Sequence, residues 1–348
     1  MKLTIEKLRG KKNPRFLIIR LKPIGDTILI SPVFRNIKKL YPGATVDVVI
    51  YPFVYDVIKN NPHVDNVIVI GRKAPNILGF YLRSLFRKYD VVIDYINNPV
   101  SAMISHLTRA GMRIGNSSKR NVFYDYKVDD REQVYSSVRC LKRLEPIGLT
   151  DYSDYLPELY LDTSDHGTAD AFLDSRGITG DIVGLFVSAK YESRQYPAEY
   201  FADVIQRIIR EYDYNVLVLF GLNDYESYEK IRDIVGDEKR VHYREPTTSL
   251  GEMAALMSRL FCLITNDTGP KHVATALRVP TLSIFGPTIE ELWNPPDRKR
   301  YPVVREMPDC ARCNKRVCPL GTIACLKELS TDKVFAAFKD LVTRLKDE

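Results

Sequence analysis

The feature that most constrains the fold of this 348-residue chain is a regular alternation of short apolar runs with longer amphipathic segments. In the first half, the apolar runs at 15–21 and 90–96 each precede a segment in which apolar residues recur at helical spacing. A second series of the same kind begins at residue 181, without any repeat of the sequence itself. Because alternating strands and helices form parallel sheets covered by helices, we expect an α/β protein with two doubly wound domains and a cleft between them.

The same pattern places the individual elements. In the first half, strands and helices are expected to alternate at 15–21, 26–41, 42–51, 55–62, 64–70, 77–89, 90–96, 101–111 and 112–116, and a further helix is expected at 134–149. In the second half, strands with their following loops are expected at 181–190, 214–221, 261–270 and 280–288, and helices at 197–212, 250–260, 271–279 and 330–346, with a Tyr- and Glu-rich helix after 221. The last helix should begin at a cap formed by Ser330, Thr331 and Asp332.

A polar segment at 150–166, with acids, Tyr and Pro but little periodicity, separates the two series. We place the domain boundary there. This gives an N-terminal domain over 1–165, a C-terminal domain over 166–328 and a terminal helical segment over 329–348. A chain of this length is long for one core and comfortable for two.

The composition is that of an ordinary folded protein, with 45% hydrophobic and 27% charged residues. No apolar run approaches the roughly 18 residues that span a bilayer, and the basic N-terminus lacks the apolar core of a signal peptide, so we expect a cytoplasmic protein. The formal net charge of +7 favours an anionic partner, whether nucleic acid, a phosphorylated substrate or an acidic membrane surface, although solubility alone also accounts for it. The basic clusters are not interleaved with aromatic residues as a single-strand binding platform requires.

The loop at 265–270 is the first candidate binding site. Parallel sheets bind ligands beyond the carboxyl ends of their strands, and here a strand ends in a polar loop that contains Asp267, Thr268 and Gly269 before a helix opens near His272. Free backbone N–H groups at a helix start suit a phosphate or diphosphate. The alternative is an ordinary capped helix in which Asp267 forms an Asx-turn.

Two further loops at strand ends strengthen the interpretation of the first loop as part of a binding site. One contains Gly286 and Thr288, and the other contains Ser188, Lys190 and Arg194, whose cations suit a diphosphate unless they merely face solvent. No G-x-G-x-x-G follows an expected strand, and no G-x-x-x-x-G-K-[ST] is present, so a dinucleotide oxidoreductase and a P-loop nucleotidase are both disfavoured.

The stretch RLKPIGDTILISPVF, residues 20–34, raises a different question, because it carries the lone carboxylate Asp26 directly behind Gly25. Asp26 is either a helix cap or a catalytic base that faces a cleft. Its position after a strand, in a domain other than that of the expected diphosphate site, favours the base.

Four of the six cysteines crowd into the pattern C-x2-C-x4-C-x6-C, formed by Cys310, Cys313, Cys318 and Cys325. In a cytosolic chain such a cluster favours a metal over disulfides, and four thiolates suit Zn²⁺ or iron in a structural role. Reduced thiols or two disulfides are the alternatives. Cys140 and Cys262 lie in apolar stretches and are expected to be buried thiols.

Three blocks of the chain together resemble glycosyltransferase family 9, the ADP-heptose:lipopolysaccharide heptosyltransferase family. These are RLKPIGDTILISPVFRNIKKLYPGATVDVV, RQYPAEYFADVI and NDTGPKHVATALRVPTLSIFGPT, in the order of the family and spread over nearly the whole chain. The resemblance implies a GT-B fold, with two Rossmann-like domains facing a central cleft, the acceptor bound mainly by the first and the nucleotide sugar by the second. It also implies that the C-terminal helix packs back toward the N-terminal domain.

The resemblance further implies transfer of heptose from ADP-L-glycero-D-manno-heptose to an inner-core lipopolysaccharide sugar, with inversion and without a catalytic metal. Asp26 matches the general base of the family, with Lys22 and Gly25 beside it on the acceptor side. The implied donor-binding residues are Ser188, Lys190, Arg194, Asp267, Thr268, Gly269, His272, Gly286 and Thr288. Arg194 stands where many members have Lys, and it keeps the charge with a different geometry. Relatives with cysteines at similar positions are described as holding iron.

Other readings of the sequence remain open. The chain is alternatively a family 9 enzyme that uses another nucleotide sugar or a protein acceptor such as an autotransporter. A nucleic-acid or partner-binding protein would carry the cysteine cluster as a separate module, whereas here the cluster is embedded before the final helix. An epimerase of the same fold would need further carboxylates, for which Asp94 and Glu192 are the only candidates. The resemblance places the enzyme on the inner face of a bacterial inner membrane, and it leaves the oligomeric state open.

Overall fold

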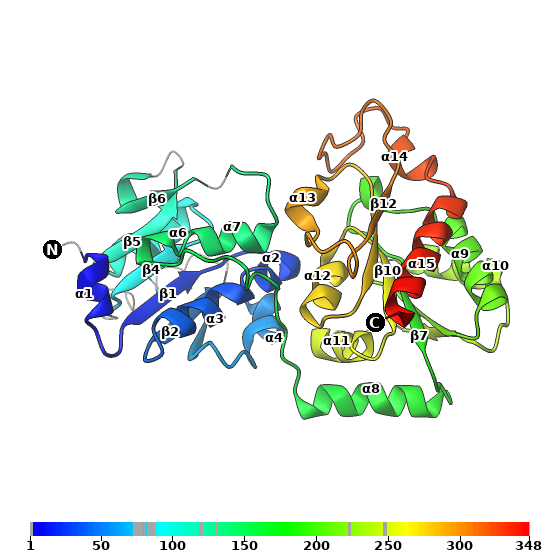
Figure 1. Ribbon diagram of the computed structural model, residues 1–348, viewed down its shortest axis with the longest axis horizontal. Coiled ribbons are helices and arrows are strands. Elements are labelled where there is room, and N and C mark those ends of the chain that lie inside the picture. The colour runs from blue at the N-terminus through cyan, green and yellow to red at the C-terminus, as the bar shows by residue number, and fades with distance from the viewer. Residues whose placement is uncertain are drawn as a thin grey trace. The chain divides into compact units, whose positions relative to one another are not determined.

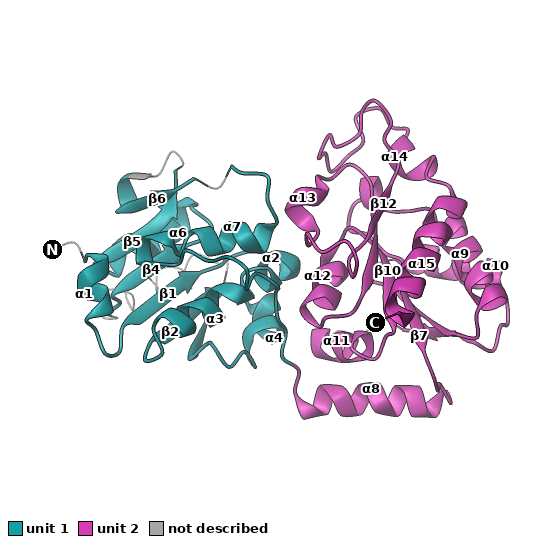
Figure 2. Cartoon of the chain, in the orientation of Figure 1, with its two compact units in different colours: residues 1–160 teal, residues 161–348 magenta. Residues whose placement is uncertain are grey.

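The computed structural model describes residues 3–71, 79, 81, 88–117, 121–129, 131–221, 224–245 and 249–347 (Figure 1). The chain divides into two compact units, residues 1–160 and 161–348 (Figure 2). The helix expected at 77–89 falls almost entirely outside the described residues. Among the described helices, none combines the length and the apolar character needed to cross a membrane.

Unit 1 is a parallel sheet with helices on its faces. Its elements are α1 (Ile5–Arg9), β1 (Arg15–Ile19), α2 (Ile24–Ile28), α3 (Ser31–Leu40), β2 (Thr45–Ile50), η1 (Pro52–Val54), α4 (Tyr55–Ile58), β3 (Asn66–Val69), β4 (Val91–Asp94), α6 (Pro99–Leu107), β5 (Met112–Asn116), η2 (Asn121–Phe123), β6 (Tyr126–Val128), α7 (Ser136–Lys142) and η3 (Glu145–Ile147). The strand order is β3-β2-β1-β4-β5-β6. In the register, Leu17 of β1 lies opposite Asp47 of β2 on one side and Val92 of β4 on the other.

Unit 2 repeats this plan. Its elements are α8 (Thr163–Ser175), β7 (Ile182–Phe186), η4 (Glu192–Arg194), α9 (Ala198–Glu211), β8 (Asn215–Leu219), α10 (Tyr225–Val235), β9 (Val241–Arg244), α11 (Leu250–Met257), β10 (Cys262–Asn266), α12 (Gly269–Ala276), β11 (Thr281–Phe285), α13 (Glu290–Trp293), β12 (Val303–Arg305), α14 (Ala324–Lys327) and α15 (Thr331–Lys346). The strand order is β12-β11-β10-β7-β8-β9, again parallel throughout.

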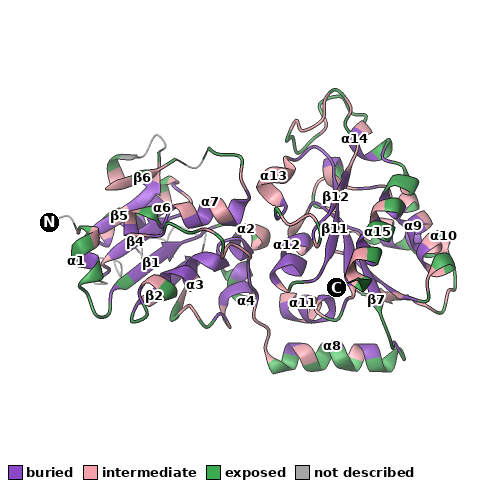
Figure 3. Ribbon diagram, viewed as in Figure 1, coloured by how far each residue is buried: buried purple, intermediate pink, exposed green. Residues whose placement is uncertain are grey.

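Both sheets therefore have the strand order 3-2-1-4-5-6 of the Rossmann fold, which confirms the expected α/β class with two doubly wound domains. The apolar runs correspond to the central strands, because helices cover both faces of these strands (Figure 3). In each sheet the strand order reverses beside the first strand, between β1 and β4 in unit 1 and between β7 and β10 in unit 2. Ligands of open α/β sheets bind outside the carboxyl ends of the strands at this switch point.

The structure differs from the expectation in several elements. The single helix expected at 26–41 is two helices, α2 and α3, because Pro32 lacks the backbone N–H that a continuous helix needs and instead sits in the first turn of α3. The short strands β6, β9 and β12 were not expected, since they lie at sheet edges and are only partly buried. Helix α8 was also not expected, because its sequence is largely polar.

The boundary between the units lies five residues before the expected one after 165. Asp162 and Asp165 form a capping box that begins α8, and α8 packs against α11 of unit 2. The terminal helix belongs to unit 2 as α15 and lies against α9, β11 and β12. Its expected packing toward the N-terminal domain stays a prediction. Ser330 accepts a hydrogen bond from the Lys333 N–H, which confirms the expected cap.

Candidate active site

An open cavity of about 430 Å³ lies in unit 2 at the carboxyl ends of β7, β8 and β10, beside the switch point. Four of the residues that the sequence singled out line it, namely Ser188, Lys190, Thr268 and Gly269. The remaining lining residues are Phe186, Ala189, Gly221, Asp224 and Pro270. The ends of β7, β8 and β10 thus meet at one cavity. The loops after β7 and β10 were expected there, whereas Gly286 and Thr288 of the loop after β11 do not line it.

The start of helix α12 forms one wall of this cavity. Thr268 occupies the N-cap position, and within the described chain its side chain makes no capping hydrogen bond. A Cβ added to Gly269 would meet no described atom within 4 Å, so the space beside the helix start is open. The first N–H groups of a helix lack intrahelical partners and carry partial positive charge. The wall therefore suits an anionic group that comes close to the backbone.

Ser188 and Lys190, in the loop after β7, also line this cavity. The Ser188 hydroxyl accepts a hydrogen bond of 2.9 Å from the Gly221 N–H, which joins the ends of β7 and β8. Lys190 is exposed, and its ammonium group lies 5.7 Å from the centre of the Tyr191 ring. The cavity thus combines an exposed cation with a helix start, both of which attract phosphate.

Asp267 has a different position from its neighbours Thr268 and Gly269, because it is buried behind the cavity wall. Its carboxylate accepts hydrogen bonds from the Lys271 ammonium group and, at 2.6 Å, from the Thr288 hydroxyl. Arg194 Nη1 lies 3.8 Å from the same carboxylate. Burial opposes ionisation of Asp267, but the charge of Lys271 and the hydrogen bonds from Lys271 and Thr288 outweigh it, so the pKa of Asp267 is lowered. Asp267 therefore anchors the loop from within.

His272 is also buried, with 5% of its surface exposed. Its Nδ1 atom makes no hydrogen bond with any described residue, and its ring lies 6.1 Å from that of Trp293. Burial, together with the neighbouring charge of Lys271, lowers the pKa of His272 to about 3. The imidazole is therefore neutral at physiological pH.

Arg194 and Gly286 lie where the loop after β7 approaches the loops after β10 and β11, respectively. The Arg194 side chain is 23% exposed, and its Nε atom is buried without a hydrogen-bond partner among the described residues. A Cβ on Gly286 would lie 2.9 Å from the backbone oxygen of Ser193. Gly286 is thus required by the close approach of two loops, independently of any ligand.

Two residues with a clear role at this site were not predicted. Asn266 is fully buried; its side chain accepts from the Tyr196 N–H and donates to the Val187 oxygen, each at 3.0 Å, so it ties the end of β10 to the loop after β7. Asp224 lines the cavity, and its Oδ2 atom is buried without a partner in the described part of the chain. An acid shortly after the second strand of a Rossmann-like sheet was the signal that could have identified Asp224.

Asp26 lies in the first turn of α2, after β1 of unit 1. The interpretation as an N-cap is wrong, because Pro23 holds that position. The Asp26 carboxylate instead lies 3.1 Å from Arg20 Nη2, while Arg20 Nε and Nη2 donate to the Asp26 backbone oxygen at 2.9 and 2.7 Å. The carboxylate keeps 29% of its surface exposed. A fixed and accessible carboxylate is what a general base requires.

Lys22 and Gly25 lie directly beside Asp26. Lys22 is exposed in the turn before α2, and its backbone oxygen accepts a hydrogen bond from Thr27 at 3.2 Å. Gly25 is partly exposed within α2. Arg20, which orients Asp26, was not predicted, although a basic residue that directly follows a buried strand was a visible signal.

The four clustered cysteines are all described and are free thiols. Burial, followed by the nearby Cys310, Cys313 and Cys318, raises the pKa of Cys325 to about 11. Backbone N–H groups of Ile323 and its neighbours lower the pKa of Cys318. Among the described residues, no three or more His, Cys, Asp or Glu side chains are arranged as a metal site. The thiols are neighbours, and the expected metal stays a prediction.

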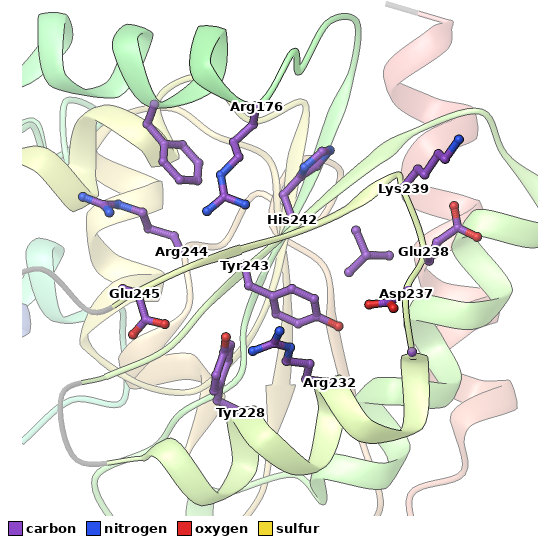
Figure 4. Close-up of a pocket in the computed structure, with 13 residues that line it drawn as sticks. Arg176, Tyr228, Arg232, Asp237, Glu238, Lys239, His242, Tyr243, Arg244 and Glu245 are labelled. Carbon is purple, nitrogen blue, oxygen red and sulfur yellow. The ribbon is translucent and has the colours of Figure 1, made fainter.

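A larger cavity of about 610 Å³ lies elsewhere in unit 2, between α8, α10 and the edge strand β9 (Figure 4). Arg176, Arg232, Tyr243 and Arg244 surround it together with Asp237 and other acids. None of the residues singled out from the sequence lines this cavity. It also lies at the outer edge of the sheet, far in strand order from the switch point, so the smaller cavity is the candidate active site.

A Rossmann-like unit with a helix start beside an open cavity at its switch point is typical of nucleotide-binding proteins. The particular family follows from comparison with known proteins. The model of Glycosyltransferase family 9 (heptosyltransferase) matches residues 81–324, more than half of the chain. The chain belongs to this family and is a glycosyltransferase, which confirms the resemblance drawn from the three sequence blocks.

Proteins similar to this chain over most of its length are heptosyltransferases. Lipopolysaccharide heptosyltransferase 3 of Escherichia coli is 23% identical over 291 residues, which cover 78% of this chain and 82% of that protein. Lipooligosaccharide heptosyltransferase 2 of Campylobacter jejuni is 28% identical over 333 residues, which cover 92% and 95%.

Solved structures show the same fold. A family 9 glycosyltransferase from Veillonella parvula has a TM-score of 0.81 at 24% identity and covers 96% of this chain and 98% of its own. An E. coli heptosyltransferase in complex with ADP has a TM-score of 0.71 at 18% identity, with 94% and 99% coverage. An iron-containing dodecameric glycosyltransferase from E. coli has a TM-score of 0.61 at 13% identity, with 96% and 80% coverage. These similarities confirm the GT-B fold class.

Proposed function

We propose that this enzyme transfers heptose from ADP-L-glycero-D-manno-heptose to an inner-core sugar of lipopolysaccharide, with inversion at the anomeric carbon. The observation that carries the proposal is the cavity of unit 2, which is lined both by Thr268 and Gly269 at the start of α12 and by Ser188 and Lys190. Heptosyltransferases among the relatives, and the relative solved with ADP, support the choice of donor.

In this proposal the diphosphate of ADP lies at the start of α12. The backbone N–H groups of that first turn that lack intrahelical partners donate hydrogen bonds to the diphosphate. They thereby stabilise the negative charge that grows on the leaving ADP. Lys190 adds a cation from the facing loop, and Arg194, already near Asp267, adds a second. The buried Asp267–Lys271 pair with Thr288 fixes the loop that presents these groups.

Asp224 is the proposed partner of the ribose. Carboxylates near the end of the second strand of a Rossmann-like sheet accept hydrogen bonds from ribose hydroxyl groups. Asp224 lines the same cavity as Thr268, and its buried Oδ2 atom lacks a partner among the described residues. A ribose hydroxyl would satisfy it, because buried acceptors without a donor are costly.

Asp26 is the proposed general base. Inversion requires one in-line displacement, in which the acceptor hydroxyl loses its proton as it attacks the anomeric carbon and the bond to the ADP oxygen breaks. Asp26 takes that proton, and its contact with Arg20 holds the carboxylate in position. Lys22 and Gly25 beside it are the proposed acceptor contacts. No step of this reaction needs a metal ion or another cofactor.

The acceptor in this proposal is anionic and lipid-linked, so the enzyme works in the cytoplasm as a peripheral protein on the inner face of the bacterial inner membrane. The net charge of +7 supports attraction to such a surface. Nucleic acid is not among the proposed partners.

For the cysteine cluster we propose a structural Zn²⁺ or iron ion. The support is the proximity of the four thiols and the iron-containing relative. Elemental analysis of protein purified without chelators tests it, with Cys310→Ser as the comparison. We expect one bound metal ion per chain in the native protein and none in the variant. If neither protein contains metal, the proposal of a structural metal ion is contradicted.

Thermal-shift and calorimetric titrations with a panel of nucleotide sugars test the proposed function. ADP and ADP-heptose should stabilise the protein, whereas UDP- and GDP-sugars should not. If only a UDP- or GDP-sugar binds, the donor assignment fails and the alternative of another family 9 transferase replaces it. If ADP-heptose binds but heptose is transferred to an autotransporter and not to a lipopolysaccharide core, the acceptor assignment fails.

A further inference from the structure

The segment between β12 and α14, residues 306–323, forms a long excursion that projects from unit 2 (Figure 1). Its outer part is largely exposed (Figure 3). Three large apolar side chains lie on it with more than half of their surface exposed: Met307 at 57%, Val317 at 78% and Leu320 at 62%. Exposed apolar side chains that gather in a protruding loop are typical of a surface that contacts a partner or a membrane.

The charge of this excursion has one sign at its tip. From Cys310 to Lys327 the sequence contains no Asp or Glu, but it contains Arg312, Lys315, Arg316 and Lys327. Arg312 forms an ion pair with Glu291. Lys315 is exposed and makes no side-chain hydrogen bond or ion pair with any described residue. The tip thus presents free positive charge directly beside Val317 and Leu320.

The tip is held in its shape by the body of unit 2. The Ser193 hydroxyl donates to the backbone oxygens of Lys315 and Arg316, at 3.2 and 2.9 Å, and the Asn314 N–H donates to the Pro287 oxygen at 2.8 Å. The Arg316 guanidinium also lies 5.4 Å from the centre of the Tyr191 ring. Because these contacts fix the backbone, Val317 is presented to the outside at little further cost in conformational entropy.

We propose that this tip docks on the anionic surface of a phospholipid bilayer. Val317 and Leu320 enter the boundary between headgroups and acyl chains, while Lys315 and Arg316 face the lipid phosphates. Apolar side chains flanked by cations are what binding at such an interface requires. A contact with a second copy of this chain, which has a net charge of +7, would bring like charges together. The inference rests on the proposed function in one respect, the lipid-linked acceptor.

Vesicle co-sedimentation tests the docking. The native protein should bind vesicles of phosphatidylethanolamine with phosphatidylglycerol, lose this binding at high salt, and bind phosphatidylcholine vesicles weakly. The variants Val317→Ser/Leu320→Ser and Lys315→Glu should each bind the anionic vesicles about five-fold or more weakly. The matched control is Ile234→Ser/Lys239→Glu, at exposed positions of α10 and the turn after it, which should bind as the native protein does. All variants should melt at the native temperature.

Several results would overturn the docking. These are unchanged vesicle binding in the tip variants, equal loss in the control, or binding only when lipopolysaccharide is present in the vesicle. A native oligomer in sedimentation velocity that Val317→Ser/Leu320→Ser dissociates would assign the tip to a second copy instead. Heptose transfer to a water-soluble, deacylated acceptor is the independent readout, and its rate should be the same in the tip variants as in the native protein. If the native protein does not catalyse this transfer, the proposed function is refuted. Vesicle binding would then still decide whether the tip docks on a bilayer.

Discussion

The carboxyl ends of the two sheets differ in chemistry although the two strand orders are the same. In unit 1, the turn after β1 presents an accessible carboxylate, Asp26, held by Arg20. In unit 2, the corresponding ends of β7 and β10 present a helix start and Lys190 around a cavity. One topology thus presents an accessible carboxylate at one switch point and a helix start with a nearby cation at the other. The two halves of a displacement reaction can therefore be tested separately.

The largest effect is expected from Asp26→Asn. Loss of the proposed base should lower turnover about a thousand-fold, whereas ADP affinity should stay unchanged, because the proposed nucleotide site lies in unit 2. Steady-state kinetics and calorimetry measure the two quantities. Asp56→Asn, at another helix start of unit 1, is the matched control and should leave both unchanged. Retained turnover in Asp26→Asn would show that Asp26 is not the general base.

The next effect concerns the anchor beneath the cavity of unit 2. Lys271→Met removes the hydrogen-bonded cation of the buried Asp267 carboxylate and leaves only Arg194 at 3.8 Å, so the free energy of unfolding should fall by about 3–5 kcal/mol. Lys333→Met removes a half-exposed pair with Glu306 and should change the free energy of unfolding much less, because exposed ion pairs contribute little. Denaturant titrations measure both.

The double variant Asp267→Asn/Lys271→Met tests the pairing itself. It should be more stable than Lys271→Met alone, because no unpaired buried charge remains. If Lys271→Met unfolds no more easily than Lys333→Met, the buried pair does not support the loop.

A smaller effect is expected from pH, through His272. The pKa of His272 is about 3 in the folded protein, whereas an unfolded chain has a histidine pKa near 6.5. Below about pH 6.5 the unfolded state therefore binds more protons, and stability falls as the pH decreases, by about 2 kcal/mol at pH 5 from this group. His272→Gln should flatten this dependence in denaturant titrations between pH 7 and pH 5. The same change at exposed His106 is the control, and an equally steep dependence in His272→Gln would contradict the assignment.

The smallest effect is expected from Asp224→Asn. Loss of a charged hydrogen-bond acceptor to the ribose should weaken ADP binding about ten-fold, with little change in turnover at saturation. If Asp224 contacts the ribose 2′-hydroxyl, the variant should bind ADP and 2′-deoxy-ADP with equal affinity. If it contacts the 3′-hydroxyl, the variant should bind ADP and 3′-deoxy-ADP with equal affinity. Asp237→Asn, in the larger cavity of unit 2, is the control. Native discrimination of both deoxy analogues by Asp224→Asn would place the ribose elsewhere.

The sequence predicted the central strands and the loops that carry the site, because strands buried on both faces are nearly continuous apolar runs. It did not predict β6, β9 and β12, since half-exposed strands of three or four residues have no such signature. It also did not separate α2 from α3, because the apolar pattern continues across Pro32.

Within the site, the sequence identified Thr268 and Gly269 from their place at a helix start. It did not show that Asp267 lies behind the wall, because that position depends on side-chain contacts with Lys271 and with Thr288, 21 residues further along the chain. Asp224 was missed for a related reason. An acid before a helix is also a common cap, and only its place in the cavity distinguishes it.

A crystal structure with bound ADP tests the central claim most directly, namely that the switch point of unit 2 is the donor site. The diphosphate should lie at the backbone N–H groups of the first turn of α12, beside Thr268 and Gly269, with the ribose within hydrogen-bond distance of Asp224. ADP bound in the cavity between α8 and α10, or bound anywhere without contact to the start of α12, would contradict it.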